Sequence, residues 1–127
     1  CEGLRGIENV IVSAEETNVE HEEGMIWGAD ITTGNDGTTA LLLDESWNQI
    51  ARGHVDIRQY YPKAGWVEHD PIEIYDSLLE AAVQALRSAG ASAREVRCIG
   101  LDNQGETIVF WDKQSGDPVY PAIVWQD

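Results

Sequence analysis

The chain has 127 residues, which is the size of one domain and too short for a multidomain enzyme acting alone. Apolar residues make up 43% of the sequence, enough to build a hydrophobic core, so the composition excludes wholesale disorder. Eight Lys and Arg stand against 23 Asp and Glu, and the formal net charge of -15 repels nucleic acid phosphates and anionic membrane surfaces. We therefore expect neither a nucleic acid nor a membrane as a partner.

The cysteine and histidine pattern predicts no metal cluster. Cys1 and Cys98 lie far apart and form no Cys-x-x-Cys pair, and the histidines have no second ligand at the usual spacing. Cys98 is expected to be a small buried residue. The sequence contains no apolar run of membrane-spanning length and no signal-peptide pattern, which predicts a cytoplasmic location.

The composition changes at Met25, the only methionine. Residues 1–24 hold seven Glu and one Arg, so we interpret them as an acidic leader, disordered or not native to the protein. Residues 25–127 are predicted to be a partial domain, because the sequence stops directly after the apolar residues 122–125. We expect the chain to be a piece of a longer protein.

Three short strands are predicted first, over residues 25–29, 38–43 and 49–57, because these β-type segments are separated by Gly, Asn, Asp and Ser. A turn around residues 33–37 should join the first two.

A helix over residues 71–89 is the clearest predicted element. Asp70 can cap it, Pro71 suits its first turn, Glu73 can complete a capping box, and Gly90 can end it in the left-handed conformation. The expected apolar stripe consists of Tyr75, Leu78, Leu79, Ala82, Val83 and Leu86.

Two further strands are predicted over residues 96–101 and 107–111, the first of them central in a sheet because its flanks are apolar. An apolar segment at residues 119–125 follows. The order of elements favours an α/β fold with a mixed sheet and helices on its faces.

The first segment with chemistry is residues 30–39 (DITTGNDGTT), where Asp30 ends a strand and hydroxyls and glycines follow. Backbone N–H groups and Thr hydroxyls can hold phosphate oxygens, and a strand-end carboxylate can hold Mg²⁺ through water. The alternative is a polar hairpin turn.

The second segment, residues 60–71 (YYPKAGWVEHDP), is aromatic and rigid, which is typical of a sugar-stacking loop. The alternative is structural, with Trp66 covering the start of the helix and Asp70 capping it.

The third segment, residues 102–107 (DNQGET), places five polar groups after a strand. Open α/β sheets bind ligands at that end of their strands, and a carboxylate with amides can hold hydroxyls. The alternative is a plain turn.

These segments make the chain from residue 25 onward resemble the FGGY carbohydrate kinases, and most of all those that act on glycerol. The resemblance rests on residues 59–71 (QYYPKAGWVEHDP) and on residues 120–127 (YPAIVWQD), which end on the family's Trp-Gln pair. It implies an actin-like, ribonuclease-H-like fold, here an incomplete N-terminal domain, in which two domains close over ATP, Mg²⁺ and a polyol or sugar.

The resemblance also implies substrate-binding residues. Glu106 falls on the glutamate that binds substrate hydroxyls, and Trp125 falls on the tryptophan that lies against the carbon face of the polyol. Gln104 and Gly105 belong to the same run, but Gly105 replaces an arginine that donates hydrogen bonds to glycerol. Glycerol is the expected acceptor, and a larger polyol or a pentulose is the alternative.

The ATP and Mg²⁺ contacts implied by the resemblance are Asp30, Thr32, Thr33 and Gly34. The family pattern is Asp-x-Gly-Thr-Thr, whereas Asp30 here lacks the glycine two residues later. Without a gap, Thr32 falls on the aspartate and Gly34 on the glycine.

The family's general base and adenine pocket lie beyond residue 127, so this chain contains no implied catalytic residue. Half a cleft cannot position an in-line phosphoryl transfer, and the chain alone is expected to be inactive without the C-terminal half. The resemblance allows a homo-oligomer of the complete protein. The alternative hypothesis is a non-catalytic remnant that binds a small polyol or a protein partner.

Overall fold

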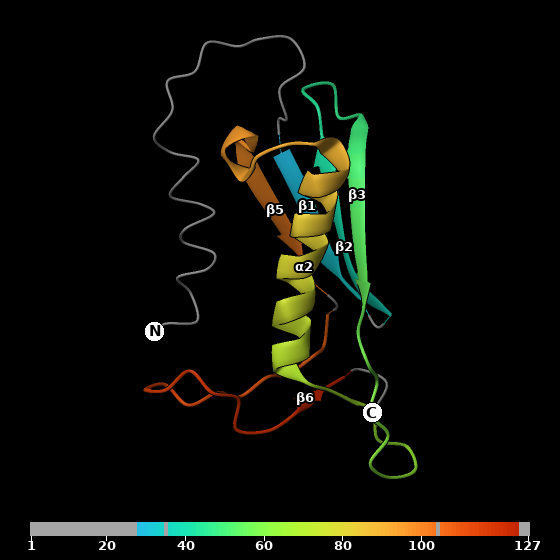
Figure 1. Cartoon of the computed structure of the whole chain (residues 1–127). Helices are drawn as coiled ribbons and strands as arrows, with labels where there is room; N and C mark the ends of the chain where they lie inside the picture. Colours follow the sequence, from blue (N-terminus) through green and yellow to red (C-terminus); the bar gives the residue numbers. More distant parts are fainter. Residues whose placement is uncertain (1–27, 35, 104, 125–127) are drawn as a thin grey trace.

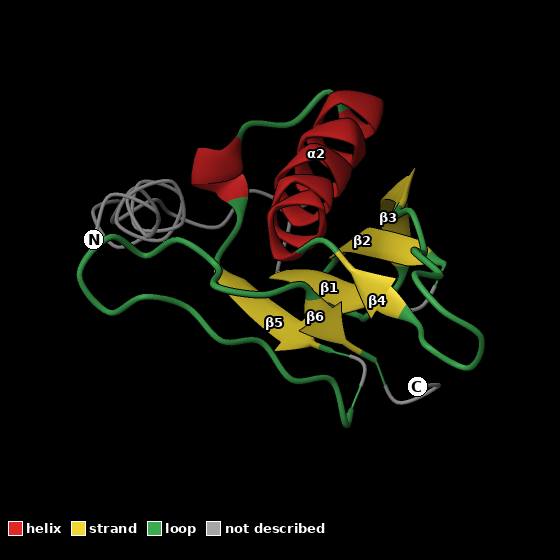
Figure 2. Cartoon of the chain, turned by 90° about the horizontal axis from the view of Figure 1, so that it is seen from below, coloured by secondary structure: helices red, strands yellow, loops and turns green. Residues whose placement is uncertain are grey.

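The computed structural model describes residues 28–34, 36–103 and 105–124 (Figure 1). The predicted acidic leader at residues 1–24 lies outside this range. The described residues form a four-stranded sheet in the order β3-β2-β1-β5, with the helix α2 across one face, and a two-stranded sheet of β4 and β6. Seen from below, β4 and β6 lie near the ends of β1 and β5, on the same side as the start of α2 (Figure 2).

An antiparallel meander forms the first half of the sheet. Its strands are β1 (Gly28–Thr33), β2 (Gly37–Leu43) and β3 (Gln49–Asp56). The predicted turn between β1 and β2 is confirmed, and the Gly34 N–H donates a hydrogen bond to the Gly37 carbonyl over 2.8 Å. β1 continues to Thr33, four residues beyond its predicted end, because Thr32 and Thr33 keep their pairing with β2.

The turn between β2 and β3 is organised by Asp44. Its carboxylate accepts hydrogen bonds from the side chain and backbone N–H of Asn48 and from the Ser46 N–H, at 2.8 to 2.9 Å. These donors favour the ionised form, with Asn48 as the largest cause, and they hold the pKa of Asp44 below its ordinary value.

The helix α2 (Pro71–Ala89) has the predicted bounds. The Asp70 carboxylate accepts a hydrogen bond from the Ile72 N–H at 2.8 Å, and Gly90 ends the helix with φ 64°. The Glu73 carboxylate, expected in a capping box, accepts a hydrogen bond from the Tyr60 hydroxyl at 2.7 Å. This bond ties the loop before β4 to the first turn of the helix.

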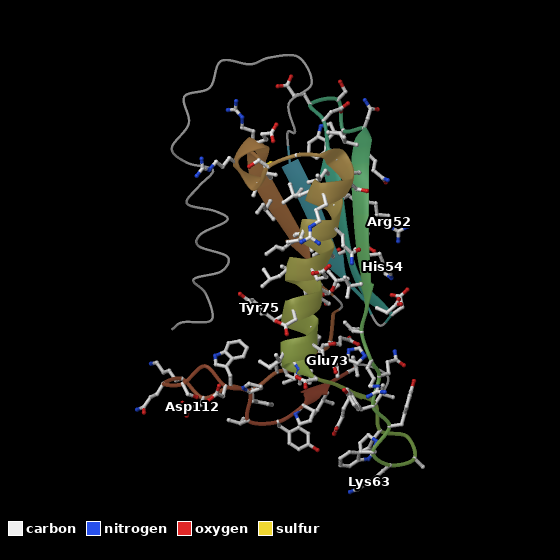
Figure 3. All side chains as sticks on the ribbon, viewed as in Figure 1. Arg52, His54, Lys63, Glu73, Tyr75 and Asp112 are labelled. Carbon is white, nitrogen blue, oxygen red and sulfur yellow. The ribbon has the colours of Figure 1, made fainter. Side chains whose placement is uncertain are left out.

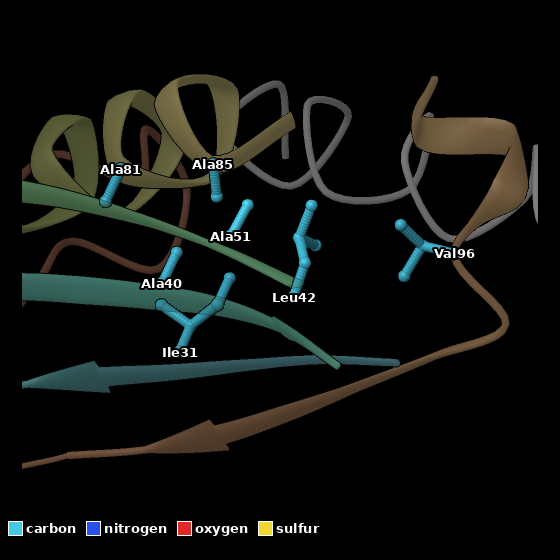
Figure 4. Close-up of a cluster of buried hydrophobic side chains, with 7 residues drawn as sticks. All are labelled: Ile31, Ala40, Leu42, Ala51, Ala81, Ala85 and Val96. Carbon is cyan, nitrogen blue, oxygen red and sulfur yellow. The ribbon is translucent and has the colours of Figure 1, made fainter. Parts of the chain in front are cut away.

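The buried face of α2 is rotated from the predicted stripe. Ser77, Ala81 and Ala85 are the buried residues of the helix, whereas Val83 is 37% exposed. The prediction for Val83 is wrong because small residues let α2 approach β3 closely. A Cβ placed on Gly53 of β3 would lie 2.0 Å from the Ala81 carbonyl oxygen. The resulting core consists of Ile31, Ala40, Leu42, Ala51, Ala81, Ala85 and Val96 (Figure 4).

β5 (Cys98–Asp102) follows the short 3₁₀ helix η1 (Ala93–Glu95) and pairs in parallel with β1. Among the described residues it is one of the two edge strands of the sheet, with β3 at the other edge, and it is mostly exposed, so the prediction of a central strand is wrong. The prediction that Cys98 is buried is also wrong. α2 lies mainly over β2 and β3, and an apolar cavity of about 120 Å³ remains between the helix and β5. Both predictions fail because α2 covers β2 and β3 and leaves β5 uncovered.

The strand predicted over residues 107–111 is reduced to isolated bridges, in which Ile108 pairs with Ile123 and Trp111 pairs with Pro118. The predicted apolar segment at residues 119–125 contains the short strand β6 (Ala122–Ile123), which pairs with β4 (Glu68–His69). A turn at residues 112–117 joins these two segments, and the Asp112 carboxylate accepts hydrogen bonds there from the backbone N–H groups of Gln114 and Ser115. These bonds lower the pKa of Asp112.

No helix in the described part of the chain is both long enough and apolar enough to cross a membrane.

His69 on β4 is 1% exposed, and neither of its ring nitrogens has a hydrogen-bond partner. Burial disfavours the imidazolium and lowers the pKa of His69, while the negative charge of Glu73 acts in the opposite direction. The unfolded chain therefore binds a proton at higher pH than the folded chain does. Stability from His69 is complete above its unfolded pKa of about 6.5 and is lost as the pH falls below it.

Urea unfolding of the 127-residue chain between pH 8 and pH 5 should show this loss, with a limiting slope of about 1.4 kcal/mol per pH unit. His69→Leu should flatten the dependence below pH 6.5. His54→Gln is the matched control, because the His54 side chain is one-third exposed and hydrogen-bonded. A slope that survives His69→Leu would contradict the assignment.

Candidate functional site

The carboxyl-terminal ends of the parallel strands β1 and β5 meet at one end of the sheet. Thr32 near the end of β1 is paired with Asp102 at the end of β5. The structure thereby brings together residues 30–39 and residues 102–107, the first and third segments that sequence analysis singled out, although they are far apart along the chain. This end of parallel strands is where open α/β sheets bind ligands.

A row of polar residues crosses the whole sheet at this level. Strand register places Asp102 beside Thr32, Thr32 beside Thr39, and Thr39 beside His54. Residues in register on neighbouring strands point to the same face of the sheet. Successive residues of a strand point to opposite faces, and Ala40, which follows Thr39, belongs to the core under α2. The row therefore lies on the face turned away from α2. Sequence analysis missed the row because it depends on the pairing of four strands.

Side-chain hydrogen bonds link the far end of this row. The Thr39 hydroxyl lies 2.8 Å from His54 Nδ1, and His54 Nε2 lies 3.2 Å from an Asp56 carboxylate oxygen. Arg52 Nη2 donates to the Thr39 hydroxyl at 3.5 Å, and Arg52 and His54 project from β3 in Figure 3. This surface therefore offers hydroxyls, an imidazole, a guanidinium and the carboxylates of Asp102 and Asp56.

Of the residues expected to contact ATP and Mg²⁺, Thr32 stands in this row, and Thr33 and Gly34 follow it. The prediction that Asp30 ends a strand is wrong, because β1 continues for three residues beyond it. Thr32 is exposed, and Thr33 and Gly34 are half-buried. The backbone of Asp30 pairs with Leu41 of β2 and with Gly100 of β5. The exposed Thr32 hydroxyl next to the exposed Asp102 carboxylate fits a hydrated Mg²⁺, which prefers oxygen ligands and keeps several waters.

The phosphate-cradling part of the turn fits a ligand less well. The Gly34 N–H already donates to the Gly37 carbonyl, and the Thr38 hydroxyl lies 2.6 Å from the Ser77 hydroxyl on the buried side of β2. Phosphate oxygens would need other donors on this surface, such as the Arg52 guanidinium, which contacts the Thr39 hydroxyl.

The proposed acceptor residues Gly105 and Glu106 follow the end of β5. Both are exposed, and Glu106 has φ 59°, in the left-handed region that non-glycine residues rarely adopt. Such a conformation is typical of functional positions. Gln104 and Trp125 lie outside the described residues.

Residues 60–71, the second segment that sequence analysis singled out, have part of the structural role that was offered as the alternative. Asp70 caps α2, as the structural alternative required. Trp66 is 39% exposed, and the Lys63 ammonium lies 4.5 Å from its ring centroid, so its indole carries a cation–π contact. Within the described range, no three His, Cys, Asp or Glu side chains gather as metal ligands.

Comparison with known proteins identifies the relatives of this chain. It is 45% identical over 93 residues to glycerol kinase 2 of Thermotoga maritima, covering 73% of this chain and 19% of the relative. It is 47% identical over 100 residues to the glycerol kinase of Mycoplasma mycoides, covering 76% of this chain and 20% of the relative. The chain thus spans about a fifth of the length of these curated relatives.

Solved structures show the same fold. The glycerol kinase of Plasmodium falciparum, determined with ADP, matches with a TM-score of 0.68 and 33% identity over 80% of this chain and 21% of that one. The xylulose kinase of Rhodospirillum rubrum matches with a TM-score of 0.70 and 23% identity over 81% of this chain and 20% of that one, a likeness of fold alone. The mixed sheet with its helix is therefore that of the actin-like kinases.

A family model extends the match to the end of the sequence. The model that describes the N-terminal domain of the FGGY family of carbohydrate kinases matches residues 25–127. This range begins at Met25, where the composition changes, and it includes both the sheet and the polar segments. Residues 25–127 carry the family's pattern over more than half of the sequence, and the chain belongs to the FGGY family of carbohydrate kinases.

Proposed function

We propose that the complete protein, of which this chain supplies the N-terminal part, transfers the γ-phosphoryl group of ATP to a hydroxyl of a small polyol, with glycerol as the first candidate. The observation that carries the proposal is the 45% identity over 93 residues to glycerol kinase 2 of Thermotoga maritima. The strand ends that bring Thr32 beside Asp102 support it.

In this proposal the Glu106 carboxylate accepts hydrogen bonds from acceptor hydroxyls, and the Trp125 indole covers the carbon face of the acceptor. Gln104 and Gly105 line the same place. Asp30, Thr32, Thr33 and Gly34 lie toward the phosphates and Mg²⁺. When bound, ATP supplies the phosphoryl group and Mg²⁺ neutralises its developing charge.

The general base is proposed to come from beyond residue 127, and so is the second wall of the cleft. Phosphoryl transfer depends on positioning and on charge stabilisation around an in-line attack, which one wall cannot supply. The 127-residue chain alone is therefore proposed to be inactive. A cytoplasmic location and a homo-oligomer of the complete protein belong to the same proposal.

An ATP-coupled assay of the complete protein with glycerol, xylulose and gluconate tests the function. Turnover of glycerol by the complete protein, with none by the 127-residue chain, is the expected result. Turnover of none of the three acceptors by a folded complete protein would contradict the proposal. Glycerol binding without turnover would instead favour the non-catalytic polyol-binding module.

Restoring the arginine at position 105 should improve the use of glycerol. A Cβ on Gly105 meets no atom within 4 Å, so the larger side chain has room. Hydrogen bonds from a guanidinium contribute about 1 to 3 kcal/mol, so Gly105→Arg in the complete protein should lower the KM for glycerol by about 10-fold. The measurement is the KM for glycerol at saturating ATP.

Gly105→Leu is the matched control, since leucine fills the space without donors and should leave the KM for glycerol unimproved. An unchanged KM in Gly105→Arg would show that the acceptor does not lie beside residue 105.

A further inference from the structure

A second concave surface is lined by none of the residues proposed for ATP, Mg²⁺ or the acceptor. It is a groove of about 650 Å³ formed by residues 60–62 and 68–71 on one side and residues 118–121 on the other. The pairing of β4 with β6 and the bridge between Tyr60 and Glu68 hold the two sides together. This volume is within the usual range of ligand sites.

The walls of the groove are unusually rich in proline and tyrosine. All four prolines of the chain line it, namely Pro62, Pro71, Pro118 and Pro121. Three of the four tyrosines do so as well, and two of them expose much of their rings to solvent, Tyr61 with 66% and Tyr120 with 46%. Proline rings fix the backbone, so the shape of the groove is formed before any ligand arrives.

Hydrogen bonds hold the tyrosine rings in place. The Tyr60 hydroxyl donates to Glu73 at 2.7 Å, the Tyr120 hydroxyl donates to Glu68 at 2.9 Å, and the Tyr61 hydroxyl donates to Gln59. Because each hydroxyl proton is already used, the walls offer flat aromatic surfaces and oxygen acceptors. Little side-chain entropy remains to be lost when a ligand binds.

The charge of the groove is negative. Glu68, only 7% exposed, and Asp70 contribute carboxylates to its lining, in a chain whose net charge is -15. Cations of the chain itself already lie on aromatic rings of this region, with the Arg58 guanidinium 5.8 Å from the Tyr60 ring centroid. A ligand for this surface should therefore combine apolar rings with positive charge.

We propose that this groove binds an extended, proline-rich peptide segment that carries arginine. Such segments adopt the polyproline II conformation with low entropy cost and dock their rings between aromatic side chains. The arginine would pair with the Glu68 and Asp70 carboxylates, and the prolines would pack between Tyr61 and Tyr120. The lining of the groove shares no residue with the proposed kinase site, so the two proposals can fail independently.

The probe is a fluorescein-labelled nine-residue polyproline peptide with one arginine near each end. Its fluorescence anisotropy, titrated with the folded 127-residue chain, should show saturable binding that weakens as salt rises. The same peptide with glutamate in place of arginine should bind at least 10-fold more weakly, by about 1.4 kcal/mol or more.

Two variants test the groove itself. Tyr61→Ala removes an exposed ring, and Glu68→Gln removes the charge but keeps an acceptor for Tyr120, so each should weaken binding about 10-fold or more. Trp47→Ala is the matched control, because Trp47 is 70% exposed and does not line the groove. Amide chemical shifts in the complex should change around residues 60–71 and 118–121.

The proposal is overturned if the arginine peptide shows no saturable binding, if the glutamate peptide binds equally well, or if Tyr61→Ala and Trp47→Ala have the same effect. Saturable binding of maltotriose at the same residues, with none of the peptide, would also overturn it and assign the groove to a sugar.

Discussion

Replacing Gly53 with valine should cost the chain about 3 kcal/mol or more of its free energy of unfolding, a large share of the roughly 5 to 15 kcal/mol of an ordinary domain. A Cβ at this position would lie 2.0 Å from the Ala81 carbonyl oxygen and 2.8 Å from the Ala85 backbone nitrogen. Both atoms belong to the backbone of α2, so no side chain can turn aside. The helix would have to move away from β3 and open the core that Ala81 and Ala85 complete.

Urea unfolding followed by circular dichroism measures this effect. Gly105→Ala serves as the control, because a Cβ there meets no atom within 4 Å and the change should stay within about 0.5 kcal/mol. Should Gly53→Val unfold at the same urea concentration as the parent chain, the close packing of α2 on β3 would be contradicted.

Replacing Glu106 with glutamine in the complete protein should lower kcat/KM for the acceptor by about 10- to 100-fold. The reason is that hydrogen bonds to a charged group contribute about 1.5 to 3 kcal/mol, and an amide keeps the shape but loses the charge. Glu106 is exposed, so the substitution should leave the fold of the protein unchanged. The acceptor dependence of the initial rate measures the effect, while the KM for ATP should stay unchanged.

Glu45→Gln is the matched control for this experiment, because it removes one exposed carboxylate from the turn between β2 and β3. Equal acceptor kinetics in Glu106→Gln and in the parent protein would remove Glu106 from the acceptor site. A rise in the KM for ATP alone would assign the residue to the nucleotide instead.

The elements that sequence analysis predicted well are those with local causes. The helix bounds follow from Asp70, Pro71 and Gly90, each of which acts within a few residues of itself. The turn at residues 33–37 follows from its own glycines. The resemblance of residues 59–71 and 120–127 indicated the family correctly, because long ordered matches do not depend on knowing the fold.

The features that sequence analysis missed depend on contacts between distant segments. The buried face of α2 is set by Gly53, which lies on another element and offers no side chain. The exposure of Cys98 and the outer place of β5 depend on where the helix lies over the sheet. The polar row from Asp102 to His54 exists only once four strands are in register. None of these leaves a periodic signal in the sequence.

The order of the elements also shapes how this domain is made on the ribosome. The meander of β1, β2 and β3 and the helix that packs on it are close in sequence, with only β4 between them, so they can fold together as soon as they emerge. β5 emerges later and must return across that stretch to pair in parallel with β1. Until it arrives, the apolar lining between α2 and β1 faces water in the nascent chain. Synthesis that pauses between α2 and β5 would therefore prolong the interval in which chaperones are needed.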